Sequence, residues 1–84
     1  MNAKKHIERI KLLSCACCGA VGPSSCHHLR EGQGMAQRAS DFLAVPLCYE
    51  CHQGPRGVHG DRSMMRLMKL TELDMLANTI QVLL

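Results

Sequence analysis

The chain has almost no aromatic side chains: of its 84 residues none is tryptophan, and Phe42 and Tyr49 are its single phenylalanine and tyrosine. Proteins that bind single-stranded nucleic acid without sequence preference usually stack the bases on aromatic rings. So few rings cannot build such a platform. Any binding to nucleic acid is therefore expected to depend on phosphate contacts and on shape.

Long apolar segments are also lacking. No stretch of the sequence approaches the ~20 apolar residues that a membrane-spanning helix requires. The segment from Met1 to Lys11 is polar and basic and has no apolar run behind it, unlike a secretory signal. The sequence therefore predicts a cytoplasmic protein without a membrane partner, in which thiols stay reduced.

The chain is short enough to need stabilisation beyond its apolar core. We expect one domain over residues 1–84, and at this size a core alone supplies only ~3–5 kcal/mol. The 6 cysteines offer either disulfides or metal ligands. In a reducing compartment, paired C-x-x-C motifs favour zinc.

Positive charge is concentrated in the first half of the chain. Residues 1–38 carry six Lys and Arg against Glu8 and Glu31, whereas residues 39–84 carry four against five acids. This asymmetry suggests a polyanionic partner.

The pattern of residues indicates a hairpin in the middle of the chain. Residues 1–6 are expected to be frayed, and residues 8–14 are predicted to form a strand, with a short amphipathic helix as the alternative. Residues 26–30 and 42–47 read as two strands of a hairpin, joined by a long connection that includes a glycine-containing loop at 31–34.

A helical tail is predicted over about 61–84. Asp61 is a candidate cap of a first helix with Met64, Leu67 and Met68 on one face, and Thr71 is a candidate N-cap of a second. The expected core-facing residues of the second helix recur at helical spacing: Leu73, Leu76, Ala77, Ile80 and Leu83. We interpret this tail as core packing, with a partner-binding surface as the alternative.

Two C-x-x-C motifs predict a closed zinc site. Zinc binds thiolates tetrahedrally, and two such pairs from separate parts of the chain fill all four positions. The predicted ligands are Cys15, Cys18, Cys48 and Cys51. Unliganded core cysteines are the alternative, and Cys17 and Cys26 are expected to be small buried or half-exposed side chains.

Four histidines are interleaved with these cysteines, at positions 27, 28, 52 and 59. His27 and His28 are adjacent, so in a strand they point to opposite faces. Neutral imidazole is a common metal ligand, and three of the four could hold a divalent ion in an open site. The fourth would then be available as a general base.

Taken together, these motifs resemble the HNH endonuclease family, including phage-encoded recombination-enhancement nucleases. The resemblance covers about residues 12–62 and rests on the first C-x-x-C, the His27-His28 pair, the segments 26–30 and 38–41, and the segment 46–60. It implies a ββα-metal fold, an α+β architecture with a treble-clef-like zinc site, as an HNH core over about 12–62 followed by C-terminal helices.

The resemblance also implies roles for individual residues. His27 would bind a catalytic divalent metal, Mg²⁺ or another ion, and His28 would deprotonate the attacking water. His52 and His59 would complete the metal site, although they are more widely spaced than the family's common H-x₃-H. The family's middle asparagine is absent, since no asparagine lies between residues 29 and 51, and Asp41 is the candidate in its place.

The implied activity is hydrolysis of DNA phosphodiester bonds with little sequence specificity. Arg30, Arg38 and Arg56 lie close in sequence to the motifs and are candidate phosphate contacts. The implied setting is the cytoplasm of a bacterial host and a phage or prophage protein, with a recombinase or another phage protein as a further partner. The alternative is a non-catalytic zinc module that binds nucleic acid or a protein.

Overall fold

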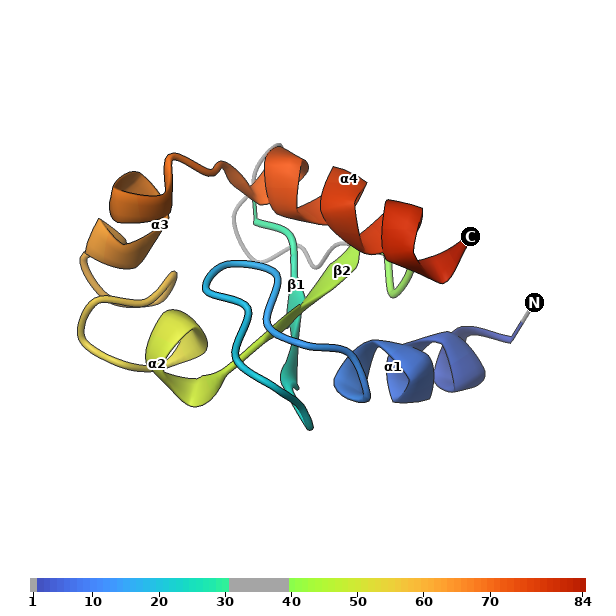
Figure 1. Ribbon diagram of the computed structural model, residues 1–84. Helices are drawn as coiled ribbons and strands as arrows, with labels where there is room; N and C mark the ends of the chain where they lie inside the picture. Colours follow the sequence, from blue (N-terminus) through green and yellow to red (C-terminus); the bar gives the residue numbers. More distant parts are fainter. Residues whose placement is uncertain (1, 31–39) are drawn as a thin grey trace.

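A two-stranded antiparallel hairpin lies at the centre of the α+β structure, with helices around it (Figure 1). The computed structural model describes residues 2–30 and 40–84; Arg38 and the predicted loop at 31–34 lie outside this part of the chain. The elements in chain order are α1 (Ala3–Lys11), β1 (Ser25–His28), β2 (Ala44–Leu47), α2 (Tyr49–His52), α3 (Ser63–Met68) and α4 (Glu72–Leu83).

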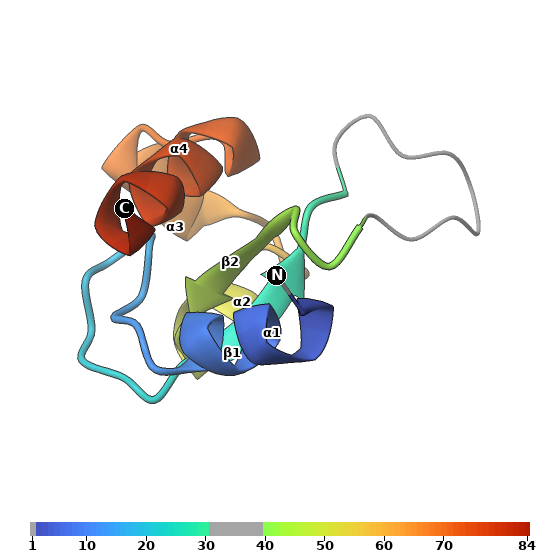
Figure 2. The same ribbon diagram turned by 90° about the vertical axis from the view of Figure 1, so that its right-hand side faces the viewer.

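The hairpin confirms the two predicted strands, although both are shorter than expected. In its register His27 faces Val45 and His28 faces Ala44. All of β2 is buried, because both α1 and α4 pack against it from different sides (Figures 1 and 2). His27 is buried and His28 is half-buried, as expected for neighbours that point to opposite faces of a strand.

The N-terminal segment is a helix, so the predicted frayed end and the predicted strand at 8–14 were both wrong. The Asn2 side chain accepts hydrogen bonds from the backbone N–H groups of Lys4 and Lys5 and caps α1. His6 and Ile10 form its buried face, and the His6 ring lies 4.9 Å from that of Phe42. The helical alternative was therefore correct, and the buried pair is spaced i, i+4.

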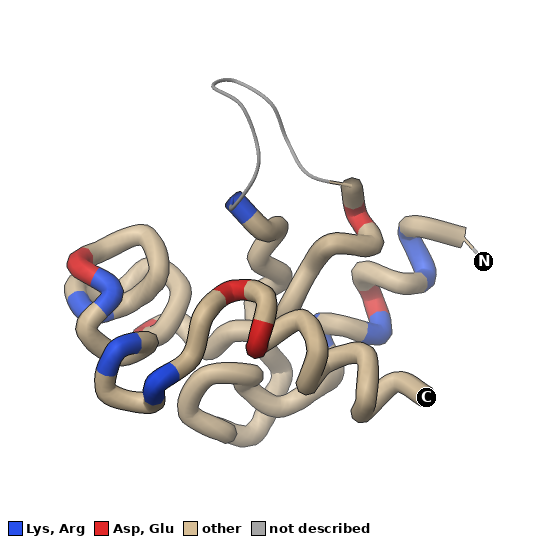
Figure 3. Tube along the Cα trace, turned by 90° about the horizontal axis from the view of Figure 1, so that it is seen from above, with Lys and Arg blue, Asp and Glu red and all other residues tan. Residues whose placement is uncertain are grey.

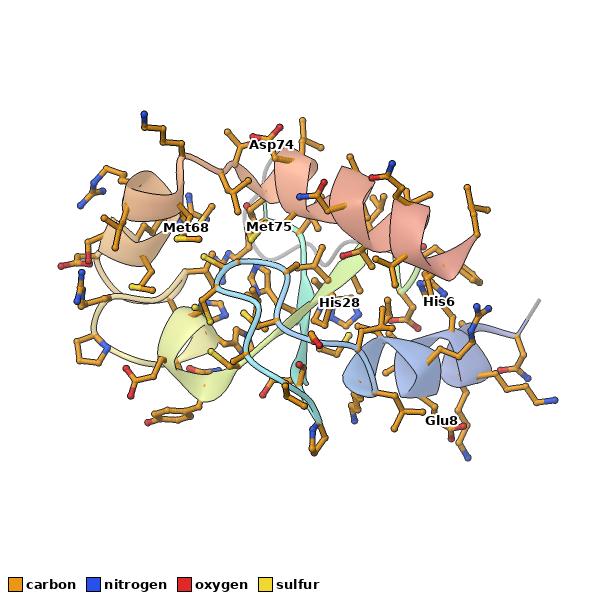
Figure 4. All side chains as sticks on the ribbon, viewed as in Figure 1. His6, Glu8, His28, Met68, Asp74 and Met75 are labelled. Atoms are coloured by element: carbon orange, nitrogen blue, oxygen red, sulfur yellow. The ribbon has the colours of Figure 1, made fainter. Side chains whose placement is uncertain are left out.

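The helical tail is confirmed, and its buried faces are confirmed in part: Met64 and Leu76 pack against the core as predicted. In α3 the buried residue is Met65, whereas Leu67 and Met68 are exposed. In α4 the buried residues are Glu72, Met75 and Thr79, whereas Leu73 and Ile80 are exposed. Met75 points from α4 toward the sheet, and Asp74 points outward (Figure 4).

The residues at the N-termini of α3 and α4 show why each helix begins where it does. Thr71 is the N-cap of α4, as predicted, and forms a capping box with Asp74. At α3 the N-cap is Arg62, with φ of 63°, and Asp61 contributes by accepting a hydrogen bond from Ser63 N. In the described ranges, no helix combines the length and apolarity needed to cross a membrane.

Candidate metal centres and the adjoining cleft

The first C-x-x-C motif forms a tight turn after α1. The Cys15 sulfur accepts hydrogen bonds from the backbone N–H groups of Cys17 and Cys18, at 3.4 and 3.5 Å. Gly19 follows with φ of 82°, a conformation that costs glycine little because it has no Cβ. The turn closes where Cys15 N donates to Ala20 O. It therefore holds Cys15 and Cys18 on one side of the loop.

The second C-x-x-C motif lies at the start of α2 and completes a four-thiol group. Cys48 is the N-cap of α2 and Cys51 lies within it. The sulfur atoms of Cys15, Cys18, Cys48 and Cys51 all lie within 4.8 Å of one another, with Cys18 and Cys48 3.6 Å apart. Tetrahedral zinc with bonds of about 2.3 Å separates its sulfurs by about 3.8 Å. The four predicted thiols therefore fit a zinc ion.

The local backbone also favours the thiolate form that zinc binds. Burial raises the pKa of the Cys15 thiol, but backbone N–H groups of the two turns outweigh burial and lower the pKa to about 7. Burial raises the pKa of the Cys51 thiol, which in addition lies beside the other sulfurs. A divalent cation removes this mutual repulsion among thiolates.

Cys17 and Cys26 lie outside the four-thiol group. Cys17 is buried in the core, where burial raises the pKa of its thiol, and Cys26 is half-buried on β1. Both positions agree with the sequence-based expectation of small buried or half-exposed side chains.

Three histidines form a second group. His27 comes from β1, His52 is the last residue of α2, and His59 lies in the following loop. One ring nitrogen from each lies within 4.8 Å of the others, and the ring centroids are 4.8 to 5.1 Å apart. Bonds of about 2.0–2.1 Å to one tetrahedral ion would place these nitrogens about 3.4 Å apart. The group therefore fits a divalent metal such as zinc.

The loop after α2 brings His59 back against His52, although the two are not on one helix. Val58 N donates to Cys51 O, and His59 N donates to His52 O at 3.1 Å. This close approach needs Gly57, because a Cβ there would lie 2.7 Å from backbone atoms of Cys51 and Glu50. The loop geometry thus replaces the helical turn that an H-x₃-H spacing provides.

Burial keeps the two inner imidazoles neutral. Burial lowers the pKa of His52 to about 4, and the repulsion that a protonated His52 would meet from any protonated neighbouring ring, His27 or His59, acts in the same direction. Burial also lowers the pKa of His27, although the hydrogen bond with Glu72 opposes it. The Nδ1 atom of His52 is buried and has no hydrogen-bond partner among the described residues. A neutral, unpaired ring nitrogen is the donor that a metal ion requires.

Glu72 contacts this group and was not identified as a site residue from the sequence. Its carboxylate lies 2.7 Å from His27 Nε2 and 3.3 Å from an Arg62 guanidinium nitrogen. Burial would raise the pKa of Glu72, but these contacts and the Arg30 backbone N–H lower it. No local pattern marks Glu72, because its partners are 45, 42 and 10 residues away.

His28 lies on the other face of β1 and contacts Asp41. Its Nε2 is 2.7 Å from Asp41 Oδ1. Both residues line a cavity of about 600 Å³. Its wall also includes Lys11, the last residue of α1, and Ser24, which directly precedes β1. Of the cavities described here, His28 lines this one and the exposed His59 lines another.

A larger cleft of about 800 Å³ opens beside the histidine group. His59 lies in its wall together with Glu72 and three arginines: Arg30, Arg62 and Arg66. Basic residues lie around α3 and at the end of β1 (Figure 3). Of the predicted phosphate contacts, Arg30 lines this cleft; Arg56 is not among its lining residues and donates to Ser63 Oγ. Arg62 and Arg66 were not predicted.

Comparison with known proteins places the chain in a family by sequence. No curated protein and no solved structure matches it. One family model matches residues 1–83, a range that contains both C-x-x-C motifs, all the histidines and Glu72. The chain therefore belongs to the family described as "Protein of unknown function (DUF968)".

Proposed function

We propose that this protein is a metal-dependent HNH endonuclease that hydrolyses DNA phosphodiester bonds with little sequence specificity. The observation that carries the proposal is the histidine group: His27 and His52 are buried, whereas His59 is exposed in the wall of a cleft. Three protein ligands with one open side are typical of a catalytic metal site, whereas four ligands close a structural one.

The order of elements supports the same proposal. Two strands are followed directly by a short helix, and the candidate ligands come from β1, from α2 and from the loop that folds back on α2. This is the ββα arrangement implied by the resemblance to HNH nucleases. The four-thiol group lies at the start of α2 and would anchor the helix that carries His52.

Charge at the cleft suits a phosphodiester. Arg30 and Arg66 are exposed, and Arg62 is half-buried beside Glu72. Guanidinium groups bind phosphate oxygens through short charge-assisted hydrogen bonds. We expect these side chains to hold the phosphates that flank the scissile bond. Such contacts position DNA without reading bases, which agrees with low sequence specificity.

In the proposed mechanism, a divalent metal when bound supplies a positive charge that stabilises the phosphate oxygens and the leaving 3′-oxygen. His27, His52 and His59 would hold it, and the arginines would orient the strand. His28 would take a proton from a water whose oxygen bonds to phosphorus while the bond from phosphorus to the 3′-oxygen breaks, and the released 3′-oxygen would take a proton from solvent. Asp41 holds the His28 ring through the 2.7 Å contact. The mechanism requires the scissile phosphate to lie within reach of both His28 and the histidine group, although His28 and His59 line different cavities.

The separation of His28 from His59 favours one alternative, a non-catalytic zinc module that binds DNA or a protein partner. In that case the histidine group is a second structural site. We propose a cytoplasmic location in a bacterial host and an origin in a phage or prophage, with a recombinase or another phage protein as a further partner. These assignments rest on the resemblance to phage HNH nucleases.

The test is cleavage of supercoiled plasmid by the full chain, first loaded with one zinc per chain and then given Mg²⁺, Mn²⁺, Co²⁺ or Zn²⁺. We expect nicked and linear DNA only with added metal, and loss of cleavage in His59→Ala. His28→Ala should lower the rate by ~10²–10⁴-fold, the usual contribution of a general base.

The matched control is His6→Gln, since His6 is a histidine of α1 that is in neither metal group. It should cleave at the wild-type rate. DNA binding without cleavage under every metal would contradict the nuclease and favour the zinc module. Equal cleavage rates in wild type and His28→Ala would contradict only the general-base role of His28 and not the nuclease activity.

A further inference from the structure

Glu72 is a buried carboxylate on a helix whose packing does not need one. It is the first residue of α4 and its side chain is 3% exposed. The other buried residues of the helix are Met75, which belongs to the hydrophobic core, and Thr79, whose hydroxyl donates to the backbone oxygen of Met75. Burying an ionised carboxylate costs several kcal/mol unless partners compensate. Its position therefore requires a reason beyond the core.

The partners of Glu72 come from the histidine group and from the cleft. Its Oε2 lies 2.7 Å from His27 Nε2 and 3.1 Å from the backbone nitrogen of Arg30. Its Oε1 lies 3.3 Å from a guanidinium nitrogen of Arg62. One carboxylate thus contacts a candidate metal ligand, the end of β1 and a basic side chain in the cleft wall.

The contact with His27 fixes the roles of the two ring nitrogens. An ionised carboxylate only accepts hydrogen bonds, so Nε2 of His27 must carry the proton in this contact. The lone pair of the neutral ring then lies on Nδ1. Glu72 itself is not a member of the group whose donor atoms lie within 4.8 Å of one another, so it lies behind His27.

We propose that Glu72 is a positioning residue of the histidine metal site: it holds His27 through Nε2–H and leaves Nδ1 as the metal-binding atom. Metal-binding histidines commonly donate their second N–H to a carboxylate, which orients the ring and makes it a better donor. Arg62 balances the carboxylate charge and is held at the cleft wall by the same contact. The inference deepens the proposed function, because it rests on metal binding by His27, His52 and His59.

This role makes α4 part of the metal site. From the sequence, α4 was expected to serve in core packing, with partner binding as the alternative. In the structure its capping box places Glu72 one residue after the N-cap Thr71, facing β1. Ring orientation at His27 and docking of α4 on the hairpin are therefore linked through one hydrogen bond.

The test measures metal affinity rather than cleavage. The full chain, with one zinc per chain on the thiols, is titrated with Co²⁺ as wild type, Glu72→Gln and Glu72→Ala. Loss of a carboxylate partner of this kind weakens metal binding about 10–100-fold. We expect the larger loss for Ala and the smaller for Gln, which keeps the shape and an acceptor oxygen. Glu8→Gln on the exposed face of α1 is the matched control and should bind like wild type.

A second readout does not depend on affinity. Long-range ¹⁵N–¹H spectra of the zinc-saturated wild type report which nitrogen of His27 carries the proton, and Nε2 is expected. Protonation of Nδ1 would overturn the proposal. So would unchanged cobalt affinity in Glu72→Ala and Glu72→Gln, whether or not their thermal stability falls, and so would absence of a second metal in wild type. A wild type that binds the second metal but never cleaves DNA would contradict the nuclease and leave the role of Glu72 intact.

Discussion

The Nε2 atom of His28, the last residue of β1, lies 2.7 Å from the Oδ1 atom of Asp41, which precedes β2. Asp41 was chosen from the sequence because the middle asparagine of the HNH pattern is missing. The contact shows that Asp41 is close enough to orient the His28 ring.

If Asp41 orients a catalytic His28, its removal lowers turnover more than substrate binding. We expect Asp41→Ala to reduce kcat at least about tenfold, a fraction of what a general base contributes, with little change in KM. Asp41→Asn introduces the amide found at this place in the HNH pattern, so it should keep more activity than Asp41→Ala. Steady-state cleavage of a short labelled duplex separates the two parameters. A change confined to KM would argue that Asp41 binds DNA instead.

The four-thiol group predicts that folding depends on zinc. Structural zinc sites in small domains contribute about 10–16 kcal/mol of apparent binding free energy, comparable with the whole stability of a domain. We expect Cys51→Ser to lose the bound zinc and most of its helical circular dichroism at 25 °C, as should wild type with a strong chelator. Elemental analysis and circular dichroism measure the two effects.

Cys26→Ser provides the control, because Cys26 lies on β1 outside the four-thiol group. It should retain one zinc on the remaining thiols and fold like wild type. Full zinc retention by Cys51→Ser would show that another set of ligands holds the ion.

Stability should fall in mild acid because His52 is held neutral. Its pKa is lowered to about 4 by burial, against an ordinary value of 6.5. Between these values the unfolded chain binds more protons than the folded chain, so the free energy of unfolding decreases as pH falls. Urea unfolding at pH 7 and pH 5, with one zinc per chain, should show a larger loss in wild type than in His52→Gln. Equal losses would remove His52 as the source.

The cleft arginines predict a salt effect on DNA binding. Each phosphate contact contributes about 0.9 to the slope of log affinity against log salt concentration. Arg66→Ala should weaken binding to all sequences alike and reduce the slope by about one. Arg56→Ala, which removes an arginine bonded to Ser63 and not among those that line the cleft, is the matched comparison. Identical slopes in both variants and wild type would show that DNA binds elsewhere.

The four-thiol group and the histidine group could be predicted from the sequence because the residues that indicate them form short motifs. Two C-x-x-C pairs carry their own turn geometry, and the grouping of Cys15, Cys18, Cys48 and Cys51 follows once a hairpin returns the chain. The order of the histidines around those pairs indicated that three of the four could hold an ion, and the resemblance to HNH nucleases implied which three. Even the wide gap between His52 and His59 did not separate them, because Gly57 allows the loop to fold back.

Other features depended on contacts that periodicity does not contain. The pattern over residues 8–14 left a strand and a helix open; the structure has a helix there, capped by Asn2 and with His6 packed against the ring of Phe42. In α4 the apolar stripe at Leu73 and Ile80 is exposed, because the face with Glu72 and Met75 turns toward the hairpin. A buried glutamate on the inner face interrupts the apolar pattern, so the pattern identified Leu76 as a packing residue but missed Glu72 and Met75.

The most direct measurement is a cobalt titration of the metal-free full chain, followed by absorption spectroscopy, since Co²⁺ reports its ligands. We predict two ions per chain: a first with thiolate-to-cobalt charge transfer from the four cysteines, and a second with ligand-field bands only, from the three histidines. His59→Ala should keep the first and lose the second. A single bound ion, or thiolate absorption that grows through the second addition, would contradict the existence of two sites with separate roles.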